Sequence, residues 1–255
     1  MMRKRYLELL YFLTLKQIKV RYKQTVLGAS WAILRPLITM VVFTIVFSKF
    51  AKIQSDGIAY PIFSYCALLP WAFFSGALTS AISSIVDNSN LIKQIYFPRE
   101  IFPLSSIAAN FFDFCVASII FIGMAIFYKI NVTVFIVLVP VLLSLQILFT
   151  IGLSFFLSAL NVYYRDISHA AGFIIQIGMF ACPIVYPASA VPENLRSLYM
   201  LNPMAVIIDG YRRVILLGAA PEWKDLLVAT LTTLIVCGLS YQYFKRSEHT
   251  FADIV

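Results

Sequence analysis

The stretch INVTVFIVLVPVLLSLQILFTIGLSFFLSALNVYY, residues 130–164, lies between Lys129 and Arg165 and contains no charged side chain. A membrane-spanning helix needs about 20 predominantly apolar residues, so this stretch is long enough to cross a bilayer. A helix that is apolar on all sides is buried either in a large core or in lipid. The stretch therefore predicts a protein that resides in a membrane.

The composition of the whole chain supports this prediction. Of its 255 residues, 61% are hydrophobic and only 13% are charged, and the mean hydropathy is +0.86. Soluble globular domains are about 45–50% apolar and about 25% charged. A soluble core of this size has no room for so much apolar surface, whereas a bilayer solvates it.

Charged residues divide the rest of the chain into five further apolar runs on either side of the first stretch. We therefore expect an all-α polytopic fold with six transmembrane helices within residues 31–244, in a single transmembrane domain, 1–255. The other five predicted spans are Trp31–Phe50, the run between Asp56 and Asp87, Ile101 to about Tyr128, the run between Asp166 and Glu193, and Leu226–Phe244.

The N-terminal residues 1–30 do not fit as a span and predict an amphipathic helix at the membrane interface. The charged side chains lie opposite an apolar stripe, a pattern typical of a helix that lies in the headgroup region. A surface helix of a soluble domain is less favoured because no soluble domain follows. The stripe consists of Leu7, Tyr11, Leu15, Ile18 and Tyr22, and the opposite side of Lys4, Glu8, Lys16, Lys19 and Lys23.

A second segment, residues 193–225, is also unsuited to cross. Its uncharged run, Ser197–Ile208, is shorter than the about 20 residues that a span needs. Pro187, Pro192 and Pro203 divide this region into short pieces. We expect short re-entrant or outer helices before the last span.

The basic residues indicate the orientation and argue against nucleic acid as a partner. The net charge is +8, but eight of the 20 Lys and Arg residues lie in the first 35 positions. Most of the others flank apolar runs, where they anchor a protein to anionic lipid headgroups. The basic N-terminus predicts that this end is cytoplasmic. An even number of spans then places the tail, residues 245–255, in the cytoplasm as well.

The sequence predicts no catalytic residue and no metal site. It contains no GxxxxGK[ST] phosphate loop and no HExxH motif. Cys66, Cys115, Cys182 and Cys237 each lie in an apolar run without a CxxC pair, which favours buried thiols over zinc or disulfides. If this chain moves a solute uphill, the energy must therefore come from an ion gradient or from a partner.

Asp113 is the strongest candidate for an ionisable group inside a span. One interpretation makes it a polar group of a transport channel. The other, which we favour, makes it an acid satisfied by neighbouring polar groups at a helix interface, because the sequence shows no counter-ion. A single acid also weakens the case for ion coupling, since such carriers usually place several ionisable groups at mid-membrane.

The loop DNSNLIKQIYFPRE, residues 87–100, is the most informative segment outside the predicted spans. Asn88 or Ser89 is suited to cap a short helix, and Phe97-Pro98 ends it. A short, half-apolar helix on the cytoplasmic face suits docking into a groove of another protein. A turn that merely links two spans explains the pattern equally well.

Four segments resemble the membrane-spanning subunits of ABC exporters for bacterial surface polysaccharides, the group that serves O-antigen, teichoic acid and capsule. Together they cover almost the whole chain in the order typical of that family. They are RYKQTVLGASWAILRPLITMVVFTIVF (21–47), NLIKQIYFPREIFPLSS (90–106), NVYYRDISH (161–169) with PIVYP (183–187), and NPMAVIIDGYRRVILLG (202–218).

The resemblance implies a homodimer of six-span subunits in the bacterial inner membrane, each docked to a separate ATPase subunit that binds ATP and Mg²⁺. This chain would bind no cofactor. A second inner loop would hold Arg165 and Asp166, and residues 188–215 would form short outer helices. The segment that couples the chain to the ATPase would comprise Leu91, Ile92, Lys93, Ile95, Tyr96, Phe97, Pro98, Arg99 and Glu100.

The substrate implied by the resemblance is a polysaccharide on a polyprenyl-diphosphate carrier. Arginine and lysine at the inner headgroup level are suited to contact the diphosphate, although ordinary lipid anchoring is the favoured interpretation for most of them. These residues are Lys16, Lys19, Arg21, Lys23 and Arg35.

Two other functions remain open at this point. A permease of an ABC exporter for a compact lipid or drug would share the topology. A membrane-embedded polyprenyl transferase would need acidic metal-binding clusters, and the sequence contains no DxxD motif.

Overall fold

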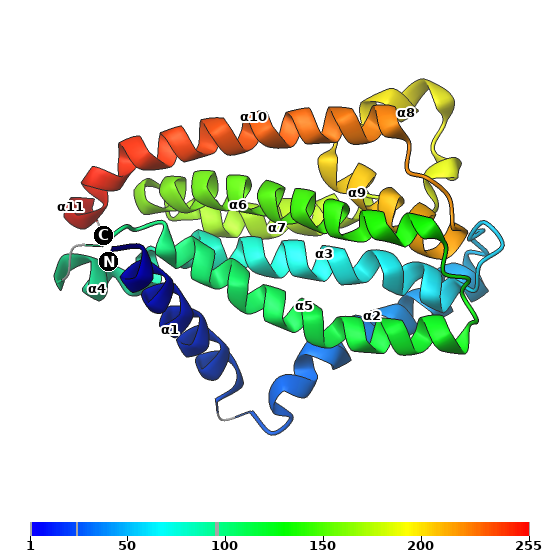
Figure 1. Cartoon of the computed structure of the whole chain (residues 1–255), viewed down its shortest axis with the longest axis horizontal. Coiled ribbons are helices and arrows are strands. Elements are labelled where there is room, and N and C mark those ends of the chain that lie inside the picture. The colour runs from blue at the N-terminus through cyan, green and yellow to red at the C-terminus, as the bar shows by residue number, and fades with distance from the viewer. Residues whose placement is uncertain (1, 24, 95–96, 255) are drawn as a thin grey trace.

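The computed structural model describes residues 2–23, 25–94 and 97–254, and within these ranges the chain is helical and contains no strand (Figure 1). The predicted all-α fold is therefore confirmed. The helices are α1 Met2–Tyr22, α2 Trp31–Phe43 with its π-helical continuation η2 Thr44–Phe50, α3 Tyr60–Ser83, α4 Ser89–Gln94, α5 Ile101–Phe127, α6 Val139–Tyr163, α7 Asp166–Phe180, α8 Glu193–Tyr199, α9 Pro203–Tyr211 with its π-helical continuation η6 Arg212–Leu217, α10 Trp223–Ser247 and α11 Phe251–Ile254.

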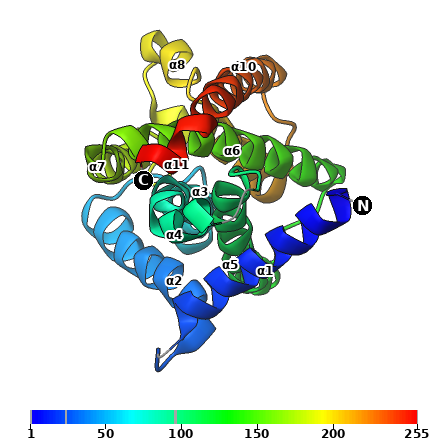
Figure 2. The ribbon, with the colours of Figure 1, turned by 90° about the vertical axis from the view of Figure 1, so that its left-hand side faces the viewer.

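The long helices form a bundle, and both ends of the described chain lie at the same end of it, beside α4 (Figure 1). Seen from that end, the other helices surround α3, and α1 lies obliquely across the bundle (Figure 2). Helix α3 packs against α2, α5, α6, α7 and α9, and most of its residues are buried. It is the central element of the fold.

Gln146 of α6 connects the central helix to two of its neighbours. Its side-chain amide donates to the carbonyl of Pro70 in α3, with 2.7 Å between Nε2 and O. Its Oε1 accepts a hydrogen bond of 3.1 Å from the hydroxyl of Tyr211 at the end of α9. Since all of these groups are buried, the bonds satisfy polar atoms that would otherwise destabilise the core.

Five described helical segments are long and apolar enough to cross a membrane, whereas six spans were expected. They are Gly28–Phe50, Tyr60–Ser83, Ile101–Phe127, Val134–Tyr163 and Trp223–Thr250. The predicted fifth span corresponds to α7, whose 15 residues extend only about 22 Å. After Phe180 the chain turns, and Cys182, Ile184 and Val185 pack into the core instead of prolonging the helix. The run between Asp166 and Glu193 is apolar as the sequence indicated, but the helix within it ends at Phe180, so it is too short for the predicted span.

Residues 188–217 form the short helices expected before the last span. Helix α8 is mostly exposed, and Figure 1 places it at the end away from the termini. Helix α9 is buried on nearly every side and packs on α3, α6 and α10. Its start is capped by Asn202, whose side chain accepts a 3.1 Å hydrogen bond from the backbone N–H of Met204.

A buried arginine fixes the loop before these helices. The Arg212 side chain is 3% exposed, and its guanidinium lies 3.6 Å from the centroid of the Phe63 ring in α3. It donates to the carbonyls of Pro183, of Ile184 at 2.7 Å and of Tyr186 at 3.1 Å. One side chain thereby ties the loop that follows α7 to the central helix.

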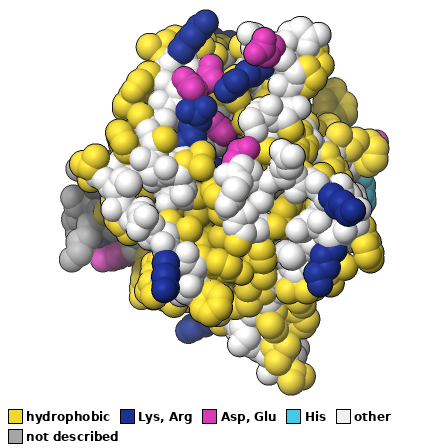
Figure 3. All heavy atoms as spheres, turned by 90° about the vertical axis from the view of Figure 1, so that its right-hand side faces the viewer, with side chains coloured by type: hydrophobic (Ala, Val, Ile, Leu, Met, Phe, Trp, Pro, Cys, Tyr) yellow, Lys and Arg dark blue, Asp and Glu magenta, His cyan; other side chains and the backbone are white. Residues whose placement is uncertain are grey.

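Charged side chains of both signs gather over one part of the face that lies away from the termini, while apolar side chains cover much of the rest (Figure 3). At this end Arg213 forms ion pairs of 2.9 Å with Asp209 and with Glu222. These pairs connect α9 and η6 to the beginning of α10.

The predicted N-terminal segment, residues 1–30, contains helix α1, which ends at Tyr22, and the apolar contacts of this helix with the core come from residues outside the predicted stripe. Leu13 is buried, and Tyr6, Leu9 and Leu10 pack beside it against the core at the terminal end of the bundle. Leu7, at the start of the predicted stripe, is exposed. The predicted stripe is therefore exposed only at its start, at Leu7 and Tyr11, whereas Tyr22 at its end contacts Asp113 of α5.

The predicted tail is not free. Helix α10 continues to Ser247, a 3₁₀ turn covers Glu248–Thr250, and α11 packs on α4 and α6. Phe251 is fully buried together with Ile92, Phe102 and Phe244. The sequence did not reveal this because the tail is short and polar apart from a few apolar residues.

Candidate functional site: a polar cavity between α1, α2, α3 and α5

A cavity of about 500 Å³ lies between α1, α2, α3 and α5. Part of its lining is apolar and includes Trp31, Leu69, Phe73 and Phe114. The rest carries two arginines, one carboxylate and several hydroxyl groups. These polar residues are Arg21, Tyr22, Thr25, Arg35, Ser75, Thr79, Ser80, Asn110 and Asp113.

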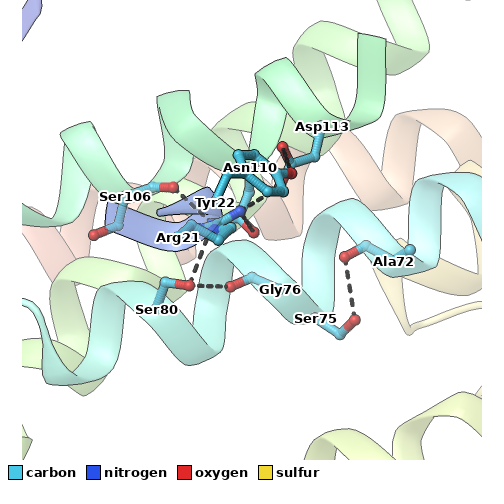
Figure 4. A network of polar contacts seen from close by, with 9 residues as sticks. All are labelled: Arg21, Tyr22, Ala72, Ser75, Gly76, Ser80, Ser106, Asn110 and Asp113. Atoms are coloured by element: carbon cyan, nitrogen blue, oxygen red, sulfur yellow. Dashed lines mark hydrogen bonds and ion pairs between the residues drawn. The ribbon is translucent and has the colours of Figure 1, made fainter. Parts of the chain in front are cut away.

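An ion pair between α1 and α5 forms the polar edge of the cavity (Figure 4). Arg21 Nη1 contacts Asp113 Oδ2, and the same nitrogen donates to Asn110 Oδ1 at 3.1 Å. The hydroxyl of Tyr22 donates to Asp113 Oδ1 at 2.5 Å. The Arg21 and Asp113 side chains are 29% and 20% exposed, so the pair is partly shielded from solvent.

Tyr22 acts as a donor in this network. Burial and the adjacent Asp113 carboxylate together raise the pKa of Tyr22 to about 12. The phenol therefore stays protonated at neutral pH. Its proton is shared with the carboxylate, which stabilises the charged form of the acid.

Asn110 joins the ion pair to the central helix. Its Nδ2 donates to the carbonyl of Ser106 at 2.8 Å and to Ser80 Oγ of α3 at 3.3 Å. A Cβ atom on Gly76 would lie 2.8 Å from Asn110 Oδ1, which is closer than real Cβ contacts allow. Only glycine at position 76 leaves room for the amide in this place.

The hydroxyl groups of α3 present their oxygens to the cavity as hydrogen-bond acceptors. Ser75, Thr79 and Ser80 each donate to a carbonyl of their own helix, at 3.3, 2.8 and 2.8 Å. A hydroxyl that has used its proton can still accept. This wall is thus suited to bind a ligand rich in hydroxyl donors.

The structure brings only some of the predicted cations together. Arg21 and Arg35 both line the cavity, and Arg35 lies 6.0 Å from the centroid of the Trp31 ring. Lys16 lines a neighbouring hollow of about 370 Å³ that Arg21 also borders. Lys19 and Lys23 are exposed and border neither space.

Asp113 has a counter-ion, which the sequence did not reveal. We expected an acid satisfied by Ser, Asn or Tyr groups, and Tyr22 is such a partner, but Arg21, which lies 92 residues away in the chain, was not expected. Asn110 and Gly76 were not predicted as site residues. Asn110 falls three residues before Asp113 and so lies on the same helix face, a signal that points to a polar seam.

The predicted coupling segment lies at the terminal end of the bundle. Ile92 and Arg99 are buried within the subunit, whereas Lys93 and Pro98 are exposed. Ile92 contributes to the subunit's own core and is not a free apolar anchor for a partner. Leu91, Phe97 and Glu100 are half-buried, while Ile95 and Tyr96 lie outside the described residues.

The predicted second inner loop joins α6 to α7. Arg165 and Asp166 are both exposed there. Figure 1 places this turn at the same end of the bundle as α4 and the termini. The two loops assigned to the inner face therefore share one face of the molecule.

Comparison with known proteins identifies the family. Residues 8–216 match the family described as the ABC-2 type transporter, and this match covers most of the chain. The chain belongs to the ABC-2 type transporter family. With five described segments long and apolar enough to cross a membrane, this ABC-2 transporter is a multi-pass membrane protein.

Several relatives are similar over nearly their whole length. The O-antigen export system permease protein RfbA of Myxococcus xanthus is 28% identical over 252 residues, which is 98% of this chain and 96% of the relative. The protein of the same name from Klebsiella pneumoniae is 28% identical over 250 residues, or 97% and 95% of the two chains. The polysialic acid transport protein KpsM of Escherichia coli is 20% identical over 92% of both chains. Membership of a transporter family removes the support for a membrane-embedded transferase.

Proposed function

We propose that this ABC-2 transporter is the membrane subunit of an ATP-driven exporter that moves a polyprenyl-diphosphate-linked polysaccharide of the O-antigen type from the cytoplasm to the periplasm. The observation that carries the proposal is the similarity to two O-antigen export permeases over at least 95% of either chain. A third relative is named for the transport of another polysaccharide, polysialic acid. The class of substrate is thus common to all three relatives.

The polar cavity is suited to the headgroup of such a carrier. Arg21 is already neutralised by Asp113, whereas Arg35 has no carboxylate partner in the part of the chain that the structure describes. A guanidinium that borders a cavity is suited to fork onto the oxygens of a diphosphate. The hydroxyl oxygens of α3 and the aromatic faces of Trp31 and Phe73 complement the first sugars of a glycan.

The energy for export would come from a separate ATPase subunit that binds ATP and Mg²⁺, while this chain binds no cofactor. The exposed side of the segment 91–100, with Lys93 and Pro98, and the exposed pair Arg165 and Asp166 form the contact surface for this subunit. Two copies of the chain would pair as a homodimer. The remaining apolar surface of the spans would then face lipid.

The exporter would lie in the bacterial inner membrane with both termini in the cytoplasm. Both ends of the described chain lie at one end of the bundle (Figure 1), and eight of the 20 basic residues fall in the first 35 positions. Positive residues are retained on the cytoplasmic side. A tag on either terminus that reacts from the periplasm in intact cells would contradict this orientation.

Transport by purified components tests the function directly. The chain is reconstituted in proteoliposomes with its ATPase and offered either a lipid-linked O-antigen or a compact fluorescent lipid. We expect ATP-dependent movement of the glycan only, with at least a tenfold loss in the Arg35→Ala variant and little change in the Lys19→Ala control. Movement of the compact lipid without the glycan would instead support an exporter of lipids or drugs.

A further inference from the structure

The end of α10 and the segment after it form an ion cluster with the predicted coupling segment. Lys245 forms ion pairs with Glu100 and, at 2.9 Å, with Glu248. The backbone N–H of Arg99 donates to Glu248 Oε1 at 2.9 Å, and the Arg99 guanidinium donates to the backbone carbonyl of Glu248. Two consecutive residues of the segment are therefore bonded to two residues of the C-terminal end.

Apolar packing also joins the C-terminal end to the coupling segment. Phe251 of α11 is fully buried, and its ring lies 5.5 Å from that of Phe244 in α10. Both belong to the cluster that contains Ile92 of α4 and Phe102 of α5. The C-terminal end thus contacts both the segment 91–100 and the helix that follows it.

Glu248 takes part in three of the four polar contacts of this ion cluster, those with Lys245, with the Arg99 backbone and with the Arg99 guanidinium. Arg99 is only 8% exposed, and its backbone N–H needs an acceptor at a place where water has little access. The same carboxylate holds Lys245, which in turn holds Glu100. Removal of the Glu248 carboxylate would break the hydrogen bond to Arg99 and one of the two ion pairs of Lys245.

We propose that Glu248 is a positioning residue that fixes the segment 97–100 to the last span, so that a displacement of this segment moves α10 together with α5. The inference rests on the proposed function, since an ATPase must act on the segment. Without the ion cluster, the segment would be connected to the bundle through α5, which begins at Ile101, and through apolar packing with Phe244 and Phe251. With the ion cluster, a displacement of the segment by the ATPase subunit moves both α5 and α10, two spans that lie far apart in the sequence.

The ion cluster is better suited to restrain movement between the segment 97–100 and α10 than to stabilise the fold. The Lys245 and Glu100 side chains are 34% and 18% exposed, so each ion pair alone contributes little to stability. Their geometry, however, bonds the backbone N–H of Arg99 to the turn after α10 and the side chain of Glu100 to the last turn of α10. Such a bonded turn resists relative movement even where its net stabilisation is small.

A distance measurement tests the link without depending on the glycan. In a background with the four native cysteines replaced, spin labels are placed at Asn90→Cys in α4 and Gln242→Cys in α10, both of which are exposed and lie outside the proposed ATPase contact. The complex with the ATPase is measured without nucleotide and after trapping with ATP and vanadate. We expect one unchanged distance in the parent and a changed or broadened one in the Glu248→Ala variant. A changed distance in the parent would overturn the proposal.

Export and hydrolysis measurements complete the test with matched variants. Glu248→Ala should bind the ATPase and hydrolyse ATP but export at least tenfold less per ATP, and Glu248→Asp should recover much of the loss. The control is Glu222→Ala, which also removes an ion-paired glutamate but at the opposite end of the bundle. Equal export by the two alanine variants would refute the link. A parent complex that traps nucleotide but exports no glycan would instead refute the proposed substrate, and a chain that binds no ATPase would refute both.

Discussion

Breaking the ion pair between Arg21 and Asp113 is expected to loosen α1 from α5. Asp113→Asn preserves the shape of the side chain and an acceptor for Tyr22 but removes the charge. Arg21→Gln removes the cation and leaves the carboxylate with the Tyr22 hydroxyl as its remaining partner. The double variant removes both charges at once, so the three variants together form a double-mutant cycle.

The burial of the two side chains sets the size of the effect. Exposed pairs are worth up to about 1 kcal/mol, and loss of one partner from a fully buried pair costs about 3–5 kcal/mol. Arg21 and Asp113 are 29% and 20% exposed, and each retains a second partner. We therefore expect each single variant to lose about 1–2 kcal/mol, with a coupling energy of about 1 kcal/mol.

Thermal unfolding of the detergent-solubilised protein measures these values. For a chain of this size, 1 kcal/mol corresponds to about 2–4 °C in the midpoint, so each single variant should unfold about 2–8 °C earlier. The double variant should lose less than the sum of the two. Lys19→Gln, on the exposed side of the same helix, should shift the midpoint little. Strict additivity would refute the idea that the two residues stabilise the structure as a pair.

Three further changes test other parts of the structure. Gly76→Ala should displace the amide of Asn110 and lower stability by about 1–3 kcal/mol, while Gly123→Ala, where a Cβ meets open space, should be neutral in the same melting assay. Arg212→Gln should leave buried carbonyls without donors and cost about 1–3 kcal/mol, with faster proteolysis of the loop after α7 as a second readout. Lys93→Glu should weaken co-purification of the ATPase without changing the melting temperature; unchanged co-purification would exclude this side chain from the contact.

Runs without charge predicted most of the fold because a bilayer imposes a length on every element that crosses it. The same criterion failed for the fifth run. Hydropathy measures whether residues prefer an apolar environment, and Cys182, Ile184 and Val185 do lie in one. It cannot distinguish a helix in lipid from a loop that is buried among helices and bonded to Arg212.

The contacts of the polar residues were predictable only in part. The predicted stripe of α1 begins at Leu7, whereas the face of α1 that packs on the core holds Tyr6, Leu9, Leu10 and Leu13, which also recur at helical spacing. The pattern alone does not decide which of two apolar stripes meets the protein. Asp113 was identified as an unusual residue, but its partner Arg21 belongs to α1, 92 residues earlier in the chain. Pairing across such a distance depends on the fold and has no local signature.

The hydrogen bonds of α3 have a consequence for how the protein is made. This helix leaves the ribosome before α5, α6, α7 and α9, the neighbours that later bury it, and it is the least hydrophobic of the five long apolar segments. For a time it must therefore be stable with lipid around it. The hydroxyl groups of Ser75, Thr79 and Ser80 each donate a hydrogen bond to a backbone carbonyl of their own helix. The hydroxyl donors that later line the cavity are thus satisfied within α3 itself while the helix is surrounded by lipid, before its neighbours have been inserted.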